Sequence, residues 1–290
     1  MAITGLSCAD YGWPLLEHTH VMRHIADMGF EAVDIGLFAG RSHIRPEVVR
    51  HDVPWWAGCI QERLSQVSLQ CADVFFAPAT HDLRIMAANS PDPEDNAAGR
   101  AFFLAAVDFA SRIGAPGISM NSGMEFPGDS TEASLARSAE GLRWRIDKAA
   151  ERGLKVSIEG CAGTNTDTPS KLGRILELIP ELSLTLDYTH YVSQGFDEVE
   201  LDALLGRSRH IHIRGGAKGR MQTSFSDNQI DYARVMRATR EHAYDGFVGV
   251  EYVWTELWDC DETENTMETI RFRDFLRRAL EQPEPGTTSA

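Results

Sequence analysis

The second half of the chain contains four short apolar runs, and each ends in a residue that can bind a metal. The runs are VSIEG, LTLDYTH, HIHIR and VGVEY, and the metal-binding residues are Glu159, Asp187, His212 and Glu251. Short runs rich in Val, Ile and Leu are typical of strands that are buried on both faces. Because helix-length segments separate these runs, they predict the second half of a parallel (β/α)8 barrel with its active site at the C-terminal ends of the strands.

The first half of the chain shows the same alternation of strand-like and helix-like segments. Strands are predicted at 3–7, 31–36, 67–75 and 117–123, and helices at 15–28, 96–113 and 131–152. Further helices are expected to begin near Pro54, Thr168 and Asp231, and a last helix is expected over 264–280. The sequence therefore predicts a single (β/α)8 TIM barrel over 1–281, followed by a disordered tail over 282–290.

Composition narrows the function further. The chain has 290 residues, and a (β/α)8 barrel typically needs roughly 250, so one barrel with elaborated loops uses all of it. A formal net charge of −15 argues against a surface for nucleic acid or anionic membranes. We see no signal peptide and no apolar run of membrane-spanning length. The five cysteines are widely spaced without a CxxC motif, as expected of reduced thiols in a cytoplasmic protein.

The charges at the four strand ends favour a metal site. Three carboxylates and one imidazole at the same barrel mouth would be unstable unless a cation lay between them. One acidic residue at a strand end more often accepts a loop hydrogen bond, but four at successive strand ends indicate a shared ligand. The oxygen-rich set suits one divalent ion, and we expect Mn²⁺, with Mg²⁺, Co²⁺ or Zn²⁺ as alternatives.

The segments around these residues resemble a known group of enzymes. They are IEG at 158–160, LDYTH at 186–190, HIHIRG at 210–215 and YDGFVGVEY at 244–252. Together they resemble the xylose-isomerase-like barrel superfamily, whose sugar isomerase/epimerase group includes ketose 3-epimerases, hydroxypyruvate isomerase and inosose dehydratase, with endonuclease IV as a distant relative. The resemblance covers nearly the whole chain in strand order, although its specific motifs lie in the second half.

The resemblance implies particular roles for these residues. Glu159, Asp187, His212 and Glu251 would hold one divalent metal, which chelates a hydroxy-ketone and stabilises an enediolate. Glu159 and Glu251 would remove and return the proton of the adjacent carbon, and His190 would contact the substrate or relay a proton. The chain departs from typical ketose 3-epimerases at 214–229, where a longer glycine-rich loop replaces their short arginine-containing loop.

Other polar and aromatic residues are candidates for substrate contacts. Asn121 falls at the end of a predicted strand, where it would bind a sugar hydroxyl or only cap a loop. Arg214 and Arg220, more than Lys218, could bind an anionic or hydroxylated substrate, although loop charges are usually only solvated. Trp254 would stack on a sugar or form a subunit contact.

A smaller set of residues is expected to support the site. His210 shares a face with His212 because strand side chains alternate, and it would lie one layer below as a buried or supporting group. Cys161, two residues after Glu159, either approaches the site or packs as a small side chain. The Trp55–Trp56 pair is more typical of a core or interface than of a substrate site.

We therefore expect a metal-dependent sugar isomerase or epimerase that acts on a small sugar or sugar derivative and forms a homo-oligomer. The first alternative is a lyase or dehydratase on a keto-sugar, keto-inositol or oxidised glycoside, with or without a small partner subunit. An endonuclease-like phosphodiesterase would need several metals and more histidines on the second and third strands than the sequence has. A non-catalytic binding barrel is disfavoured because all four predicted ligands are present.

Overall fold

The computed structural model describes residues 3–281, and within them eight parallel strands close into a barrel. In the order in which they occur in the chain they are β1 (Gly5–Ala9), β2 (Ala32–Phe38), β3 (Gln70–Ala77), β4 (Gly117–Asn121), β5 (Lys155–Glu159), β6 (Ser183–Asp187), β7 (Ser208–Ile213) and β10 (Phe247–Val250). β1 pairs with both β2 and β10, which closes the barrel. The predicted (β/α)8 TIM barrel is confirmed, and the predicted tail at 282–290 lies outside the described residues.

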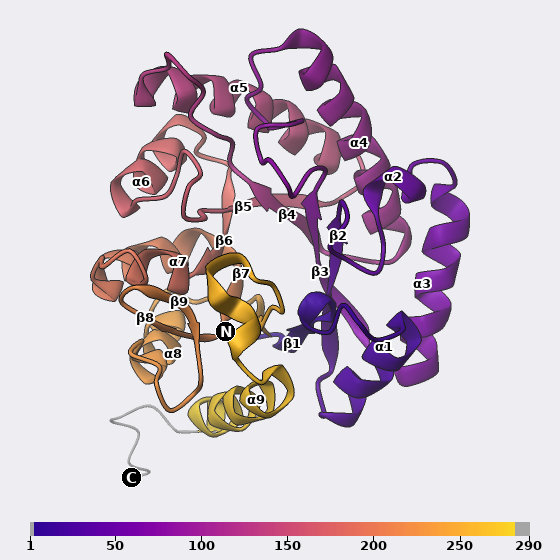
Figure 1. Ribbon diagram of the computed structural model, residues 1–290, viewed down its shortest axis with the longest axis vertical. Helices are drawn as coiled ribbons and strands as arrows, with labels where there is room; N and C mark the ends of the chain where they lie inside the picture. Colours follow the sequence, from indigo (N-terminus) through magenta and orange to yellow (C-terminus); the bar gives the residue numbers. More distant parts are fainter. Residues whose placement is uncertain (1–2, 282–290) are drawn as a thin grey trace.

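Helices surround the barrel on the outside (Figure 1). The longer ones are α1 (His18–Asp27), α3 (Val53–Val67), α4 (Pro93–Arg112), α5 (Thr131–Ala150), α6 (Pro169–Leu178), α8 (Tyr232–Glu241) and α9 (Asn265–Glu281). Their apolar faces and the outward-facing residues of the strands form the main hydrophobic core. None of the helices described between residues 3 and 281 is both long and apolar enough to cross a bilayer.

Capping residues set several helix starts, as the sequence indicated. The Thr168 hydroxyl accepts a hydrogen bond from the Lys171 N–H at 3.3 Å before α6. The Asp231 carboxylate accepts one from the Arg234 N–H at 3.0 Å before α8. The helix predicted from residue 96 begins earlier, at Pro93, because Asp92 caps it. Side-chain oxygens at these positions satisfy N–H groups that have no partner within the helix.

The connections after β6 and β7 contain structure that the sequence did not predict. Between β6 and β7 lie α7 (Thr189–Val192) and the 3₁₀ helix η2 (Glu198–Arg207). The predicted loop at 214–229 contains an antiparallel hairpin of β8 (Gly215–Ala217) and β9 (Arg220–Thr223). Gly219, with φ of 78°, lies in its turn, where glycine has no steric penalty.

One short α-helix and two 3₁₀ segments complete the top and side of the barrel. η1 (Asp10–Gly12) follows β1, α2 (Pro46–Val49) precedes α3, and η3 (Leu257–Glu262) follows β10. The segment around η3, drawn in gold, crosses in front of the barrel in Figure 1. It therefore lies over the end of the barrel where the strand-end residues meet.

The barrel interior is unusually polar. TIM barrels are generally filled by branched aliphatic side chains, but here the inward-facing layer below the strand ends consists of Ser7, Asp34, Asp73, Ser119, Ser157, Thr185 and His210, all buried. Arg209 bonds the Asp73 carboxylate at 2.6 Å and the Ser157 hydroxyl at 2.7 Å. The irregular register between β6 and β7 at Leu184 and Thr185 lets consecutive residues of β7 both reach the interior.

Gly249 leaves room for one part of this polar layer. A Cβ at this position would lie 2.2 Å from Asp34 Oδ2 and 3.0 Å from His210 Nε2. Asp34 Oδ2 already accepts a hydrogen bond from the Ser7 hydroxyl at 3.0 Å and lies 3.1 Å from His210 Nε2. A side chain at Gly249 would therefore push apart a buried, hydrogen-bonded carboxylate.

We predict that Gly249→Ala lowers the free energy of unfolding by about 1–3 kcal/mol, the usual cost of overpacking a tight interior. Gly58→Ala is the matched control, because no atom lies within 4 Å of a Cβ built there in the middle of α3. The control should gain about 0.5–1 kcal/mol from helix propensity. Urea unfolding measures both, and equal stability of the two variants would contradict the close approach at Gly249.

Candidate metal and active site

A cavity of about 150 Å³ lies at the C-terminal ends of the strands. Six of the residues predicted for the site line it: Asn121, Glu159, His190, Arg214, Glu251 and Trp254. His212 and Asp187 are buried and contact these lining residues. The structure thus brings the four predicted strand-end residues to one end of the barrel.

The centre of the site is an imidazole between two carboxylates. His212 Nδ1 lies 2.7 Å from Glu159 Oε1 and 3.5 Å from Glu251 Oε1. Donor atoms of these three residues all lie within 4.8 Å of one another. A neutral imidazole that directed its Nδ1 lone pair at two ionised carboxylates would be repelled by both. The arrangement therefore requires either a proton on His212 Nδ1 or a metal ion between these groups.

The same carboxylates have pKa values shifted in opposite directions. Burial alone would raise the pKa of Glu159, but His190 and His212 lower it well below its usual range. Burial raises the pKa of Glu251, and the negative charge of Glu159 adds to the rise while His212 and Arg214 oppose it. Burial would lower the pKa of His212, but Glu251, Glu159 and Asp34 raise it to about 10. Two carboxylates with separated pKa values are typical of sites that move protons.

Asp187 is beside this group and is held by other partners. Its Oδ1 accepts hydrogen bonds from the Thr189 N–H at 2.8 Å and the Thr189 hydroxyl at 2.6 Å. Its Oδ2 accepts one from Arg214 Nη2 at 2.9 Å. Arg214 also lies 3.5 Å from Glu251 Oε2, and these buried carboxylates raise the pKa of its guanidinium. The role of Asp187 as a fourth metal ligand stays a prediction, and Arg214 would have to release it.

The residues present fit a divalent ion. Glu159, Asp187 and Glu251 carry three negative charges in a buried volume where Arg214 supplies the one fixed positive charge among the site residues named here. Carboxylate oxygens with one imidazole nitrogen match the ligand preferences of Mn²⁺ and similar ions. His212 Nε2, which has no hydrogen-bond partner among the described residues, lies 3.8 Å from Asp34 Oδ2. A carboxylate on that side can orient a metal-binding histidine.

His190 follows β6 on the short helix α7. Its Nε2 lies 3.7 Å from Glu159 Oε2 and 3.7 Å from Asp187 Oδ2, and 3.4 Å from Arg214 Nη2. The imidazole lines the cavity and is almost fully buried. It therefore lies beside the Glu159 and Asp187 carboxylates at the cavity wall, and its contact with substrate stays a prediction.

The remaining residues that the sequence predicted to contact substrate divide into two groups. Asn121 lines the cavity and donates to Cys161 Sγ at 3.3 Å, and Trp254 lines the cavity at its mouth. Arg220 begins β9, and its side chain is exposed on the hairpin and is not among the residues that line the cavity. Its contact with substrate stays a prediction. Lys218 is also exposed.

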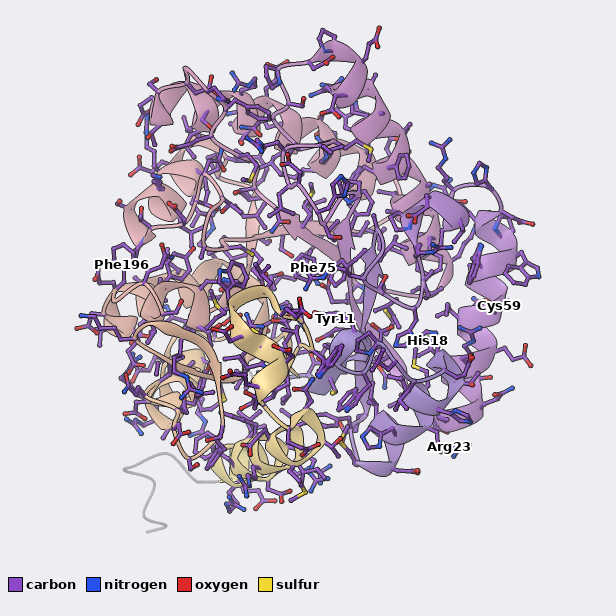
Figure 2. All side chains as sticks on the ribbon, viewed as in Figure 1. Tyr11, His18, Arg23, Cys59, Phe75 and Phe196 are labelled. Atoms are coloured by element: carbon purple, nitrogen blue, oxygen red, sulfur yellow. The ribbon has the colours of Figure 1, made fainter. Side chains whose placement is uncertain are left out.

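Sequence reasoning gave no role to Tyr11, and gave Cys161 only two unresolved alternatives. The Tyr11 hydroxyl donates to Glu251 Oε1 at 2.7 Å, and Cys161 Sγ donates to Glu159 Oε2 at 3.0 Å. Burial and the charge of Glu251 raise the pKa of Tyr11 well above its usual value, so the phenol keeps its proton. A Cβ on Gly36 would lie 2.5 Å from the Tyr11 ring, so glycine there makes room for it. In Figure 2, Tyr11 lies near the barrel centre, far from Cys59 on the outer helices.

The family comparison agrees with this geometry. The family described as "Xylose isomerase-like TIM barrel" matches residues 22–278. The chain belongs to this family, and the resemblance drawn from its four segments is confirmed.

Individual relatives are of two kinds. An inosose dehydratase of Lacticaseibacillus casei is 27% identical over 142 residues, which cover 42% of this chain and 48% of that protein. The chain thus spans about half the length of the curated relatives it matches. A solved D-tagatose 3-epimerase-like protein has a TM-score of 0.74 at 17% identity and covers 96% of this chain and 97% of its own. A probable 3-DHS dehydratase from Bacillus anthracis has a TM-score of 0.70 at 13% identity, covering 94% and 98%. At these identities the solved structures show a shared fold alone.

We predict that Mn²⁺ raises the melting temperature of the metal-free protein. A ligand at a hundredfold excess over its Kd adds about 2.7 kcal/mol, which corresponds to a rise of about 5 °C for a chain of this size. The rise should vanish in His212→Ala and Glu251→Gln and persist in His20→Ala, whose histidine is exposed on α1. The melting temperature of each variant is measured with and without Mn²⁺, so a change in the stability of the metal-free variant does not affect the comparison. An equal rise in His212→Ala would show that the ion binds elsewhere.

Proposed function

We propose that this protein is a divalent-metal-dependent sugar isomerase or epimerase, and that Mn²⁺ is its ion. The observation that carries the proposal is the pair of buried carboxylates, Glu159 and Glu251, which both approach His212 Nδ1 and line the same cavity. Such a pair can take a proton from one face of a carbon and return one to the other face. The substrate is a ketose or related hydroxy-ketone small enough for the cavity.

Proton transfer follows from the two carboxylates. A divalent ion bound to Glu159, Asp187, His212 and Glu251 would polarise the substrate carbonyl and make the adjacent C–H more acidic. One carboxylate takes that proton while the C–H electron pair moves toward the carbonyl oxygen, and the other carboxylate delivers a proton as the pair returns. The raised pKa of Glu251 suits it to hold the proton between these steps.

The surrounding residues orient the reacting groups. Tyr11 donates to Glu251 Oε1, and Arg214 Nη1 lies 3.5 Å from Glu251 Oε2, so the carboxylate is held from both sides. Arg214 and His190 line the cavity and present N–H groups toward substrate oxygens. Asn121, which pairs with Glu159 on the neighbouring strand, would bind a hydroxyl, and Trp254 would cover the substrate.

We predict that the Mn²⁺-loaded protein incorporates deuterium from D₂O at the carbon beside the carbonyl of its ketose substrate. Candidate ketoses are incubated with the protein, and exchange is followed by NMR. Removal of a positioned acid or base costs on the order of 100-fold or more in rate, so Glu159→Gln and Glu251→Gln should each lose at least that factor. Glu62→Gln, an exposed control on α3, should exchange at the wild-type rate. Undiminished exchange in both site variants would overturn the proposal.

A dehydratase is the second candidate, because the curated relatives matched over about half their length are inosose dehydratases. The first step is the same proton abstraction beside a carbonyl. A hydroxyl on the next carbon then leaves with a proton, and His190 or the phenol of Tyr11 is placed to supply that proton. The products are an unsaturated ketone and water.

Product analysis separates the two candidates. We predict that inosose and simple ketoses, incubated with the Mn²⁺-loaded protein, give an isomer of unchanged mass. A product lighter by one water, with the ultraviolet absorbance of a conjugated ketone, would instead identify a dehydratase. Mass spectrometry measures the product mass, and ultraviolet absorbance of the same samples detects the conjugated ketone.

A further inference from the structure

A second cavity lies on the outside of the barrel, between α4 and α5. Its volume is about 330 Å³, and the two helices that form its walls lie next to each other in Figure 1. None of the residues that line it also lines the cavity at the strand ends. A ligand bound between α4 and α5 would therefore not be the substrate of the proposed reaction.

Two arginines dominate the charge of this cavity. Arg100 of α4 and Arg137 of α5 both line it. Arg137 pairs with Asp129, but Arg100 forms no ion pair with a carboxylate of residues 3–281, and its Nε has no hydrogen-bond partner among them. One lining residue is acidic, Glu140, and its side chain is exposed and forms no ion pair with either arginine. The lining therefore carries an excess of positive charge.

A third arginine lies directly behind the cavity wall. Arg145 is only 1% exposed, and its Nη1 donates to the carbonyl oxygens of Ala88 and Gly141 at 3.5 and 3.0 Å. Both of these residues line the cavity. Arg145 Nε has no hydrogen-bond partner in the described part of the chain. Burial and the positive charge of Arg100 lower the pKa of Arg145 to about 10, so the guanidinium is still protonated at neutral pH.

The protein balances these positive charges only in part. The guanidinium groups of Arg100 and Arg145 lie 4.9 and 5.9 Å from the centre of the Trp144 ring, and that of Arg145 lies 5.5 Å from the Phe103 ring. Aromatic faces attract cations. A buried guanidinium usually also has a carboxylate partner, because an unpaired buried charge is costly. An anion in the cavity would supply the missing negative charge, since it would lie beside Arg100 and close to Arg145.

We propose that the cavity between α4 and α5 binds a phosphate group, either of a phosphate monoester or of free phosphate. The planar guanidinium groups of Arg100 and Arg137 offer several N–H donors from two different helices, and these match the oxygens of a phosphate. Ser90 and Asn96 add a hydroxyl and an amide to the same lining. A phosphate monoester carries nearly two negative charges and three acceptor oxygens, so it can contact both helices at once and balance more than one arginine.

Isothermal titration calorimetry tests the proposal on the whole chain without added Mn²⁺. The probes are inorganic phosphate and glycerol 1-phosphate, with chloride at the same ionic strength as the reference. Arg100→Gln should weaken binding of both probes by about tenfold or more, because it removes charge-assisted hydrogen bonds. Glu140→Gln should strengthen binding by about two- to fivefold, because it removes the negative charge of the lining. Arg23→Gln should leave binding unchanged, since this exposed arginine lies on α1, away from α4 and α5 (Figure 2).

Opposite changes in the two lining variants would support an anion in this cavity, because a general loss of stability would not strengthen binding in Glu140→Gln. Tighter binding of glycerol 1-phosphate would identify a monoester as the ligand, and tighter binding of inorganic phosphate would identify the free ion. No saturable binding beyond the chloride reference, or binding that Arg100→Gln leaves unchanged, would overturn the inference. Neither result bears on the proposed function, because the two cavities share no lining residue.

Discussion

The site depends on one contact, the approach of His212 Nδ1 to the carboxylates of Glu159 and Glu251. Two buried negative charges and a lone pair cannot share this space without a proton or a metal ion among them. A proton on Nδ1 meets this requirement in the metal-free protein, and Glu251, Glu159 and Asp34 raise the pKa of His212 to about 10 although burial would lower it. A divalent ion would meet the same requirement, and it would also polarise the substrate carbonyl in the proposed reaction.

The barrel interior is built to support that contact. Asp34 lies beneath His212 and is held by the Ser7 hydroxyl and the His210 imidazole. These groups form part of a polar layer where most barrels pack aliphatic side chains. The missing side chain of Gly249 gives the layer its space. A polar interior is costly unless its groups are bonded to one another, and the hydrogen bonds here hold Asp34 in place below His212.

The sequence predicted the barrel and the main site because both follow from local patterns. Apolar runs ending in Glu159, Asp187, His212 and Glu251 specify strands, and the C-terminal ends of parallel strands in a closed barrel must meet. Contacts made by distant segments have no such local signal. Tyr11 reaches Glu251 across 240 positions of sequence, and only the packing of η1 against β2 at Gly36 brings it there.

Arg214 and Arg220, in one loop, also show that the local sequence does not predict where a side chain points. Both were predicted to contact substrate, but the turn at Gly219 folds the loop into a hairpin that exposes Arg220. Arg214 remains at the strand end and bonds Asp187. The charge of each loop residue is visible in the sequence. The direction of its side chain depends on the hairpin, which the sequence did not predict.

The most direct test is anomalous diffraction from crystals of the protein grown with Mn²⁺. The account predicts one strong peak among Glu159, His212 and Glu251, with the Asp187 carboxylate turned from Arg214 toward it. No peak there at saturating Mn²⁺, with His212 still between the two glutamates, would show that a proton alone balances the site and would contradict a metal enzyme.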